Sequence, residues 1–332
     1  MKAMKSIVMT GARKSKVTEI EKPQISGDQI LIKVKYTGMC HSEWYPWSVA
    51  KEGETFGHEP MGTVAEVGPD VTKFKVGDRV ASLGVGYREY VAVPENRAVL
   101  VPDNVSDENA AMTEAMSCML SAVSRFPVPV AGDTIAVVGA GYMGLGAMSL
   151  LKLKGFRKIV VIDPREEARN NALKFGATEV YSPDNIPAKY LLDWKGWGGD
   201  SLTDGNEKLD TFTAGFRNVL EFTGTESGLR LAGELVSAHG LLGIGGYHND
   251  CDRTIDFKLW NVKAFTVENC HERRTDFQME LCKRALEMLS TGYWKFDDVV
   301  TNIYSMEEFD KANEEMDNKP SGYIKALIKC SE

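Results

Sequence analysis

The chain has 332 residues, of which 43% are hydrophobic and 26% charged, with 39 Lys and Arg against 47 Asp and Glu. This length fits two domains, and the composition excludes a disordered or fibrous chain. The net charge of −8 gives no general attraction to nucleic acid or anionic membranes, and no apolar run reaches the roughly 18 residues of a membrane span. Six scattered cysteines and an N-terminus without a signal-peptide core predict a reducing cytoplasm.

The first hundred residues are predicted to form mainly β structure. Residues 29–36 alternate apolar and polar side chains, as a half-buried strand does. Further short strands are expected at 62–67, at 76–80 with a turn inside it, and at 90–93, separated by turns rich in Gly, Pro and Asp. This pattern is typical of a partly open barrel. The breaker-poor segment 107–123 is predicted to be one helix.

A different pattern begins at residue 134. Continuous apolar strands are expected at 134–138 and 158–162, each followed by a helix, at 143–154 and 165–175. Strand alternating with helix predicts an α/β fold with a doubly wound parallel sheet. The later expected elements are strands at 218–222, 240–244 and 323–328, a helix at 276–290 and a surface loop at 194–206. We predict a mostly β domain from 1–120 with 268–332, and a nucleotide-binding domain at 121–267.

The segment Gly139-Ala140-Gly141-Tyr142-Met143-Gly144 has the form GxGxxG between an apolar strand and a helix. Gly139 would permit the tight turn, Gly141 would let the backbone approach a pyrophosphate, and Gly144 would let helix and strand pack closely. Tyr142 and Met143 start the helix, whose free N–H groups favour phosphate. Asp163, at the end of the next strand, would accept hydrogen bonds from ribose hydroxyls and favours NAD over NADP. Arg165 weakens this preference because it could approach a phosphate.

Cys40, His58 and Glu59 form a second candidate constellation. Thiolate, imidazole and carboxylate are all zinc ligands, and a mixed set suits a catalytic site better than a structural one. The spacing fits no compact zinc finger. Taken singly, Cys40 also fits a buried free thiol and His58 a hydrogen-bonded core histidine.

The motifs in this order resemble those of the zinc-containing medium-chain dehydrogenase/reductase family, over almost the whole chain. They are Gly-x-Cys-x-Ser-Glu from Gly38, Gly57-His58-Glu59, Val76-Gly77-Asp78-Arg79-Val80 and the glycine loop. The resemblance implies a GroES-like, mostly β catalytic domain beside the Rossmann domain. It also implies a small-molecule alcohol or ketone substrate, and a homodimer or homotetramer.

The resemblance implies that Cys40 and His58 are metal ligands and that Glu59 binds or approaches the metal. The remaining family ligand corresponds to Glu114, with Cys118 as the competing candidate four residues later. Members of the family commonly carry a four-cysteine lobe with a structural zinc, which would fall between Val80 and Tyr90. This chain has no cysteine there, so one catalytic zinc per subunit and no structural zinc is expected.

The resemblance also assigns catalytic roles. Ser42 would hydrogen-bond the substrate alcohol and pass its proton outward, and Glu43 would orient His58, unless it is only a solvated acid. The family's usual relay histidine is replaced by Tyr45, which could donate and accept a proton. Tyr45, with Trp44 and Trp47, fits pocket lining or core packing equally well.

Ile244 and Gly245 follow a late strand and correspond to positions that line the nicotinamide pocket in relatives. His248 and His271 fit either a surface position or the active cleft. The predicted reaction is hydride transfer between NAD and a secondary, polyol-like alcohol. Two alternatives remain: a zinc-free NADPH-dependent quinone or enoyl reductase of the same fold, and a non-catalytic nucleotide-binding protein.

Overall fold

A computed structural model describes residues 3–130, 132–191 and 214–332, so the loop expected at 194–206 lies outside the described residues. Within those ranges, no helix has both the length and the apolar character needed to cross a bilayer. The chain divides into two compact units, one of residues 1–118 and 272–332 and the other of residues 119–271. Helix α3 (Thr113–Ser124) contains the point at which the first unit ends along the chain.

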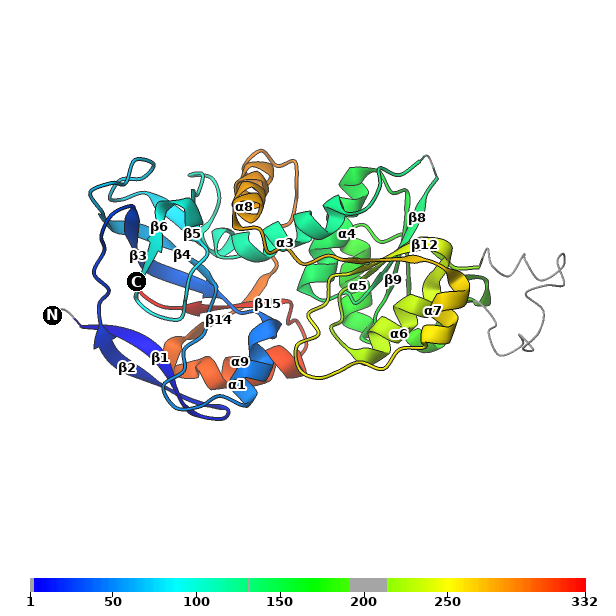
Figure 1. Ribbon diagram of the computed structural model, residues 1–332, viewed down its shortest axis with the longest axis horizontal. Coiled ribbons are helices and arrows are strands. Elements are labelled where there is room, and N and C mark those ends of the chain that lie inside the picture. Colours follow the sequence, from blue (N-terminus) through cyan, green and yellow to red (C-terminus); the bar gives the residue numbers. More distant parts are fainter. Residues whose placement is uncertain (1–2, 131, 192–213) are drawn as a thin grey trace. The chain divides into compact units, whose positions relative to one another are not determined.

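The first unit is built on a mixed seven-stranded sheet and a separate hairpin (Figure 1). The sheet order is β14-β15-β3-β4-β5-β7, with β6 also paired to β3. The strands are β1 (Ala3–Gly11), β2 (Lys14–Glu21), β3 (Gln29–Gly38), β4 (Glu59–Val67), β5 (Arg79–Ser82), β6 (Tyr90–Pro94), β7 (Ala98–Leu100), β14 (Val300–Ser305) and β15 (Lys325–Lys329). Strand β3 is central because β4, β6 and β15 all pair with it.

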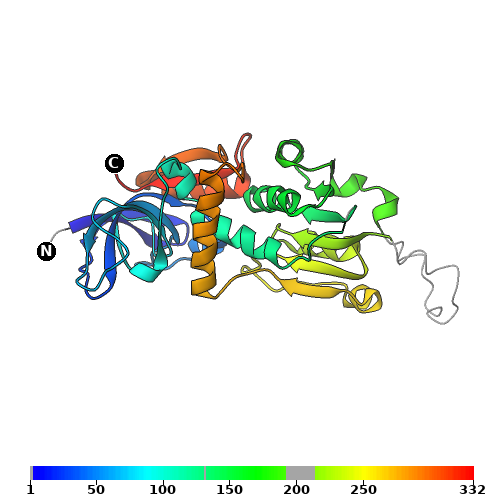
Figure 2. The same cartoon turned by 90° about the horizontal axis from the view of Figure 1, so that it is seen from above.

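The helices of this unit are short except for α8, which is seen lengthwise in Figure 2. They are η1 (His41–Glu43), α1 (Trp44–Ser48), α2 (Asp107–Ala110), α8 (Thr275–Ser290) and α9 (Phe309–Asn318). The core gathers buried residues of β3, such as Ile30 and Ile32, with Trp47 of α1 and Phe309 of α9. The catalytic candidates lie at the end of β3 and the start of β4, where this core holds the backbone in place.

The second unit is a six-stranded parallel sheet in the order β10-β9-β8-β11-β12-β13. Its strands are β8 (Thr134–Val138), β9 (Lys158–Ile162), β10 (Glu179–Tyr181), β11 (Phe216–Glu221), β12 (Val236–Ile244) and β13 (Thr266–Asn269). Its longer helices are α4 (Tyr142–Lys154), α5 (Glu166–Phe175), α6 (Glu226–Leu235) and α7 (Phe257–Lys263). Val138 aligns with Ile162 on one side and Glu221 on the other, so the loops after these strands share one edge of the sheet.

The α/β fold class, with a GroES-like part and a Rossmann sheet, is confirmed, while several local predictions were wrong. The single helix expected at 107–123 is two helices, because the chain turns at Ala111 and Met112 between α2 and α3. The strand expected at 76–80 begins only at Arg79, because the turn expected inside it, where Gly77 has a left-handed φ of 96°, precedes the strand. The hairpin of β1 and β2 was not predicted.

Candidate active site

The candidate metal ligands come from three adjoining pieces of the first unit. Cys40 caps η1 just beyond β3, and His58 directly precedes β4, whose first residue is Glu59. Because β3 and β4 are antiparallel, Gly38 pairs with Glu59, and this pairing brings the two loops together. Glu114 comes from the first turn of α3. The fold therefore brings together four side chains that lie as far as 74 positions apart in the sequence.

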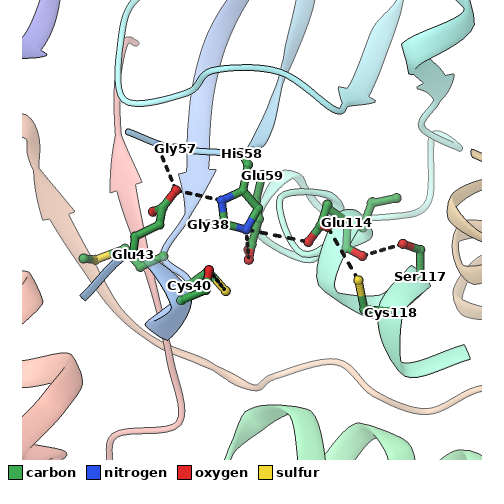
Figure 3. A network of polar contacts seen from close by, with 12 residues as sticks. Gly38, Cys40, Glu43, Gly57, His58, Glu59, Glu114, Ser117 and Cys118 are labelled. Carbon is green, nitrogen blue, oxygen red and sulfur yellow. Dashed lines mark hydrogen bonds and ion pairs between the residues drawn. The ribbon is translucent and has the colours of Figure 1, made fainter. Parts of the chain in front are cut away.

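Three of these side chains form one compact group. Cys40, His58 and Glu59 each offer a ligand atom, and these atoms all lie within 4.8 Å of one another. The Nε2 of His58 is 3.9 Å from Glu59 Oε1 and 4.0 Å from Glu114 Oε2 (Figure 3). Glu114 thus faces the same imidazole nitrogen but stands outside the 4.8 Å group.

Glu43 holds the opposite nitrogen of the imidazole. Its Oε1 lies 2.7 Å from His58 Nδ1 and also accepts the backbone N–H of Gly57 at 2.8 Å (Figure 3). A carboxylate only accepts hydrogen bonds, so Nδ1 carries a proton and Nε2 is the nitrogen that faces the other candidate ligands. Glu43 is 8% exposed, so the structure places it in the position of an orienting group and not of a solvated acid.

The two carboxylate oxygens of Glu59 have different surroundings. Its Oε2 accepts a hydrogen bond from Lys325 Nζ at 2.7 Å, and the same ammonium group donates to the carbonyl of Met39 at 2.8 Å. Its Oε1 is buried and accepts no hydrogen bond from any described residue. A buried carboxylate oxygen without a partner is costly, so this atom is suited to a cation placed between it and His58.

The charges at this site also favour a cation. Burial opposes a charge on His58, yet hydrogen bonds to Cys40 and Glu43 hold its pKa above the ordinary value. Burial, reinforced by Glu59, raises the pKa of Glu114. The three carboxylates around His58 outnumber the one lysine paired with Glu59, and a divalent ion would displace shared protons from the thiol and imidazole.

Cys118 is the weaker candidate for the additional ligand. Burial, with the charge of Glu114 next, raises the pKa of its thiol well above the ordinary range. Its Sγ donates to Glu114 Oε1 at 3.6 Å, and the amide of Gln278 donates to that same oxygen at 2.8 Å. Both contacts occupy Oε1 and leave Oε2 facing His58. The chemistry of the donor set, Cys40, His58, Glu59 and Glu114, fits zinc.

Ser42 and the aromatic cluster lie in η1 and α1 beside the metal ligands. The Ser42 hydroxyl donates to Cys40 Sγ at 3.2 Å, so its oxygen lies next to the ligand group. Tyr45 is 37% exposed, and its hydroxyl makes no hydrogen bond within the described residues. Trp47 is buried, and its indole donates to Asp310 at 2.9 Å, while Trp44 stacks on His41. Trp47 therefore packs in the core.

The glycine loop of the second unit has the geometry of a phosphate cradle. Gly139 adopts a left-handed φ of 99°, and a Cβ on Gly144 would lie 1.9 Å from the carbonyl oxygen of Gly139. A Cβ on Gly141, by contrast, would meet nothing within 4 Å. The free space stands before the first turn of α4, which begins at Tyr142 and Met143, and the N-terminus of a helix favours phosphate. These residues fit a dinucleotide pyrophosphate.

Asp163 is more occupied than its sequence position suggests. It is 4% exposed, and its Oδ2 accepts the N–H of Ala140 in the glycine loop at 2.8 Å. Its Oδ1 accepts the backbone N–H of Arg165 at 2.9 Å, and the guanidinium of Arg165 lies on both oxygens at 3.2 Å. Arg165 therefore neutralises the carboxylate that would receive the ribose hydroxyls.

The residues at the end of β12 and beyond it make contacts within the second unit. Ile244 and Gly245 are half-buried, and Gly245 donates its N–H to the carbonyl of Glu221 at 2.9 Å. The ring of His248 lies 3.2 Å from the buried carboxylate of Glu221, and that of His271 lies 3.2 Å from the carbonyl of Gly246. Both histidines are thus anchored within the nucleotide-binding unit.

Two functional neighbours were missed by sequence reasoning. Lys325 lies in the strand expected at 323–328, and the only signal was a lysine inside an otherwise apolar run. Tyr87, whose hydroxyl donates to Glu43 Oε2 at 2.7 Å, lies in the connection between β5 and β6 and carried no signal. Both depend on pairings between segments that are distant in sequence.

Two family models match this chain. Residues 26–103 match the model of the alcohol dehydrogenase GroES-like domain, and residues 143–290 match that of zinc-binding dehydrogenases. The chain therefore belongs to the zinc-containing medium-chain dehydrogenase/reductase family and is an oxidoreductase.

Individual relatives are more distant. An L-threonine 3-dehydrogenase of Caldanaerobacter subterraneus is 26% identical, over 90% of this chain and 91% of its own length. Among solved structures, an Escherichia coli oxidoreductase/dehydrogenase of unknown specificity has a TM-score of 0.82 at 24% identity, with full coverage of both chains. The 2R,3R-butanediol dehydrogenase of Bacillus subtilis has a TM-score of 0.78 at 23% identity, covering 99% of this chain and 100% of its own.

Proposed function

We propose that this chain is a zinc-dependent dehydrogenase that transfers hydride between a secondary, polyol-like alcohol and NAD, giving a ketone. The observation that carries the proposal is the group of Cys40, His58 and Glu59 within 4.8 Å, with Glu59 Oε1 buried and unsatisfied. One zinc ion per subunit would be held by Cys40, His58 and Glu59 or Glu114, with no structural zinc. Bound zinc supplies Lewis acidity toward an alcohol or carbonyl oxygen, and the nicotinamide supplies the hydride chemistry.

The protein's own residues would orient the substrate and move its proton. Ser42 Oγ stands 3.2 Å from Cys40 Sγ, so it can accept the proton of an alcohol beside the ligand group. Glu43 keeps His58 in one orientation throughout. Tyr45, half-exposed on α1, is the candidate to pass the proton from Ser42 to solvent, a role that Tyr45→Phe would remove.

The cofactor would bind at the glycine loop. The open space at Gly141 and the start of α4 would take the pyrophosphate, and Ile244 and Gly245 would line the nicotinamide. Ribose binding by Asp163 requires the Arg165 side chain to leave the carboxylate, which the 37% exposure of that side chain permits. A bare ribose hydroxyl suits Asp163 better than a phosphate does, which supports NAD.

A polyol-like substrate follows from the carboxylates. Glu59 and Glu114 both face His58 Nε2, and a carboxylate oxygen that is not used for the metal can accept a hydrogen bond from a neighbouring hydroxyl. L-threonine and 2R,3R-butanediol, which name two of the relatives, both carry a secondary alcohol next to a second polar group. We also propose a homodimer or homotetramer that pairs through β13, one of the two terminal strands of the described sheet.

Metal analysis of the purified protein, combined with NADH formation on a panel of polyols, tests the proposal. Cys40→Ala should abolish turnover while leaving NAD affinity within about threefold, because the glycine loop keeps all its own contacts. Cys251→Ala, which removes an exposed cysteine of the nucleotide-binding unit, is the control and should retain activity. A fully active protein without a divalent ion would refute the proposal and favour the zinc-free reductase.

A further inference from the structure

Tyr87 is buried in contact with Glu43 and has an unusual backbone conformation. It is 1% exposed and adopts a left-handed φ of 51°, which is rare for a bulky residue that is not glycine. Such a conformation persists only where the surroundings enforce it, and it is found mainly at functional sites. The strained residue lies in the connection between β5 and β6.

The surroundings that enforce it are the loops that carry the metal ligands. The neighbouring Gly86 donates its N–H to the carbonyl of Gly57 at 3.0 Å, and a Cβ on Gly57 would lie 2.8 Å from the backbone of Gly86. The N–H of Tyr87 itself donates to Thr37 Oγ1 in β3 at 3.3 Å. The connection is therefore pressed directly against the residue that precedes His58 (Figure 3 shows Gly57 beside Glu43 and His58).

The phenol ends at the carboxylate that orients His58. Its hydroxyl lies 2.7 Å from Glu43 Oε2 and 3.3 Å from the carbonyl of Gly38, while Glu43 Oε1 serves Gly57 and His58. Both carboxylate oxygens of Glu43 are thus held, Oε1 by Gly57 and His58 and Oε2 by Tyr87. Burial and the charge of Glu43 raise the pKa of Tyr87 well above its ordinary value, so the phenol keeps its proton and donates.

We propose that Tyr87 is a positioning residue of the metal site, which fixes the Glu43 carboxylate so that His58 presents Nε2 to Cys40 and Glu59. The inference rests on the proposed function, since it assumes that this group binds zinc. Without the phenolic donor, Oε2 of Glu43 loses its 2.7 Å contact, and the carboxylate, held then through Oε1, gains freedom to rotate relative to Nδ1. The imidazole then samples orientations in which Nε2 no longer faces the other ligands.

Tyr87→Phe tests this directly because it removes one hydroxyl and keeps the ring that packs on Phe309, at 4.9 Å between centroids. Zinc affinity, measured by competition with a chromophoric chelator, should weaken about tenfold, the lower range for partners of ligating histidines. The matched control is Tyr304→Phe, which removes another buried phenol that donates to a carboxylate, Glu315, in the same unit. Its zinc affinity should stay within about twofold of wild type.

Two spectroscopic readouts separate positioning from a general loss of stability. In zinc-loaded protein, the imidazole NMR signals of His58 should report a single Nδ1-protonated form in wild type and in Tyr304→Phe, and broadened or doubled signals in Tyr87→Phe. In wild type, the Tyr87 hydroxyl proton should give a slowly exchanging signal with a nuclear Overhauser effect to the His58 Nδ1 proton. This second measurement needs no variant, so it holds even if Tyr87→Phe does not fold.

Unchanged zinc affinity and unchanged His58 signals in Tyr87→Phe would overturn the inference while leaving the proposed function intact. Absence of the hydroxyl-to-imidazole effect in wild type would overturn it as well. Failure of the wild-type protein to bind zinc would instead remove the proposed function together with the inference.

Discussion

Lys325 is the lysine that pairs with the buried Glu59, and Lys325→Met is therefore a severe test of the site's electrostatics. The ammonium and the carboxylate are 5% and 0% exposed, and Lys325 also satisfies the carbonyl of Met39. Removing one partner of a buried ion pair costs about 3–5 kcal/mol, because the other charge stays uncompensated in the interior. Methionine keeps the length and apolar volume of the side chain, so little of this loss comes from packing.

The measurement is urea unfolding of the metal-stripped protein, followed by circular dichroism. The control is Lys329→Met on the same strand, whose partner Glu332 is 94% exposed. Exposed pairs contribute about 0–1 kcal/mol, so the two lysines of β15 should differ by at least about 2 kcal/mol. Equal losses for the two variants would refute the argument that Lys325 compensates a buried charge.

Zinc provides a second comparison within the same variant. If the ion binds beside Glu59 Oε1, its charge compensates the buried carboxylate, which has lost its lysine partner in Lys325→Met. The destabilisation should therefore be smaller in zinc-loaded than in metal-stripped protein, whereas Lys329→Met should show no such difference. The same loss in both states would place the ion away from Glu59.

Other variants probe the remaining features. Gly141→Ala should leave the free energy of unfolding within about 0.5 kcal/mol of wild type, because its Cβ meets open space. The same Cβ would occupy space that the pyrophosphate needs, so NAD binding should weaken at least about tenfold. Gly144→Ala should instead destabilise the fold, because its Cβ would lie 1.9 Å from the carbonyl oxygen of Gly139. Equal NAD affinity in Gly141→Ala and wild type, by titration calorimetry, would argue against a phosphate at this loop. Arg165→Ala should raise the ratio of kcat/KM for NAD over NADP about five- to tenfold, because it frees the Asp163 carboxylate and removes a phosphate-binding cation; an unchanged ratio would contradict this. Arg274 holds the pKa of Glu272 at about 2, against 4.5 ordinarily. The ion pair therefore contributes fully to the free energy of unfolding above about pH 4.5, and the contribution is lost as the pH falls toward 2. Between pH 4.5 and pH 2, the free energy of unfolding should therefore fall by about 1 kcal/mol less in Glu272→Gln than in wild type, a figure reduced by the 69% exposure of the Arg274 side chain. Glu287→Gln, at an exposed pair with Lys283, should lose as much as wild type over this range.

Local signals in the sequence were sufficient for much of the nucleotide-binding unit. The strand at 134–138 and the strand at 158–162 were predicted to the residue, because apolar runs bounded by Gly and Asp are unambiguous in a parallel sheet. The break between α2 and α3 at Ala111 and Met112 was missed since neither residue is a helix breaker. The hairpin of β1 and β2 was missed because half-exposed strands rich in lysine lack a continuous apolar pattern.

The site was harder to predict because its chemistry depends on pairing between distant segments. Cys40, His58 and Glu59 lie within 20 residues and could be recognised together. Lys325 meets Glu59 only because β15 pairs with β3, which in turn pairs with β4. The role of Asp163 likewise changed once the guanidinium of Arg165 was placed on its carboxylate. Motifs in the sequence suggested the candidate ligands, but the groups that neutralise or orient them come from tertiary structure.

The three carboxylates around His58 are all held in the same way. Each is anchored through one oxygen, Glu43 by the phenol of Tyr87, Glu59 by Lys325 and Glu114 by Gln278. Each then presents the other oxygen to the imidazole, at Nδ1 for Glu43 and toward Nε2 for Glu59 and Glu114. Because an anchored carboxylate loses little freedom when it binds a ligand, the proposed metal site would be organised before an ion arrives. Loss of an anchor should therefore lower metal affinity even though every ligand remains.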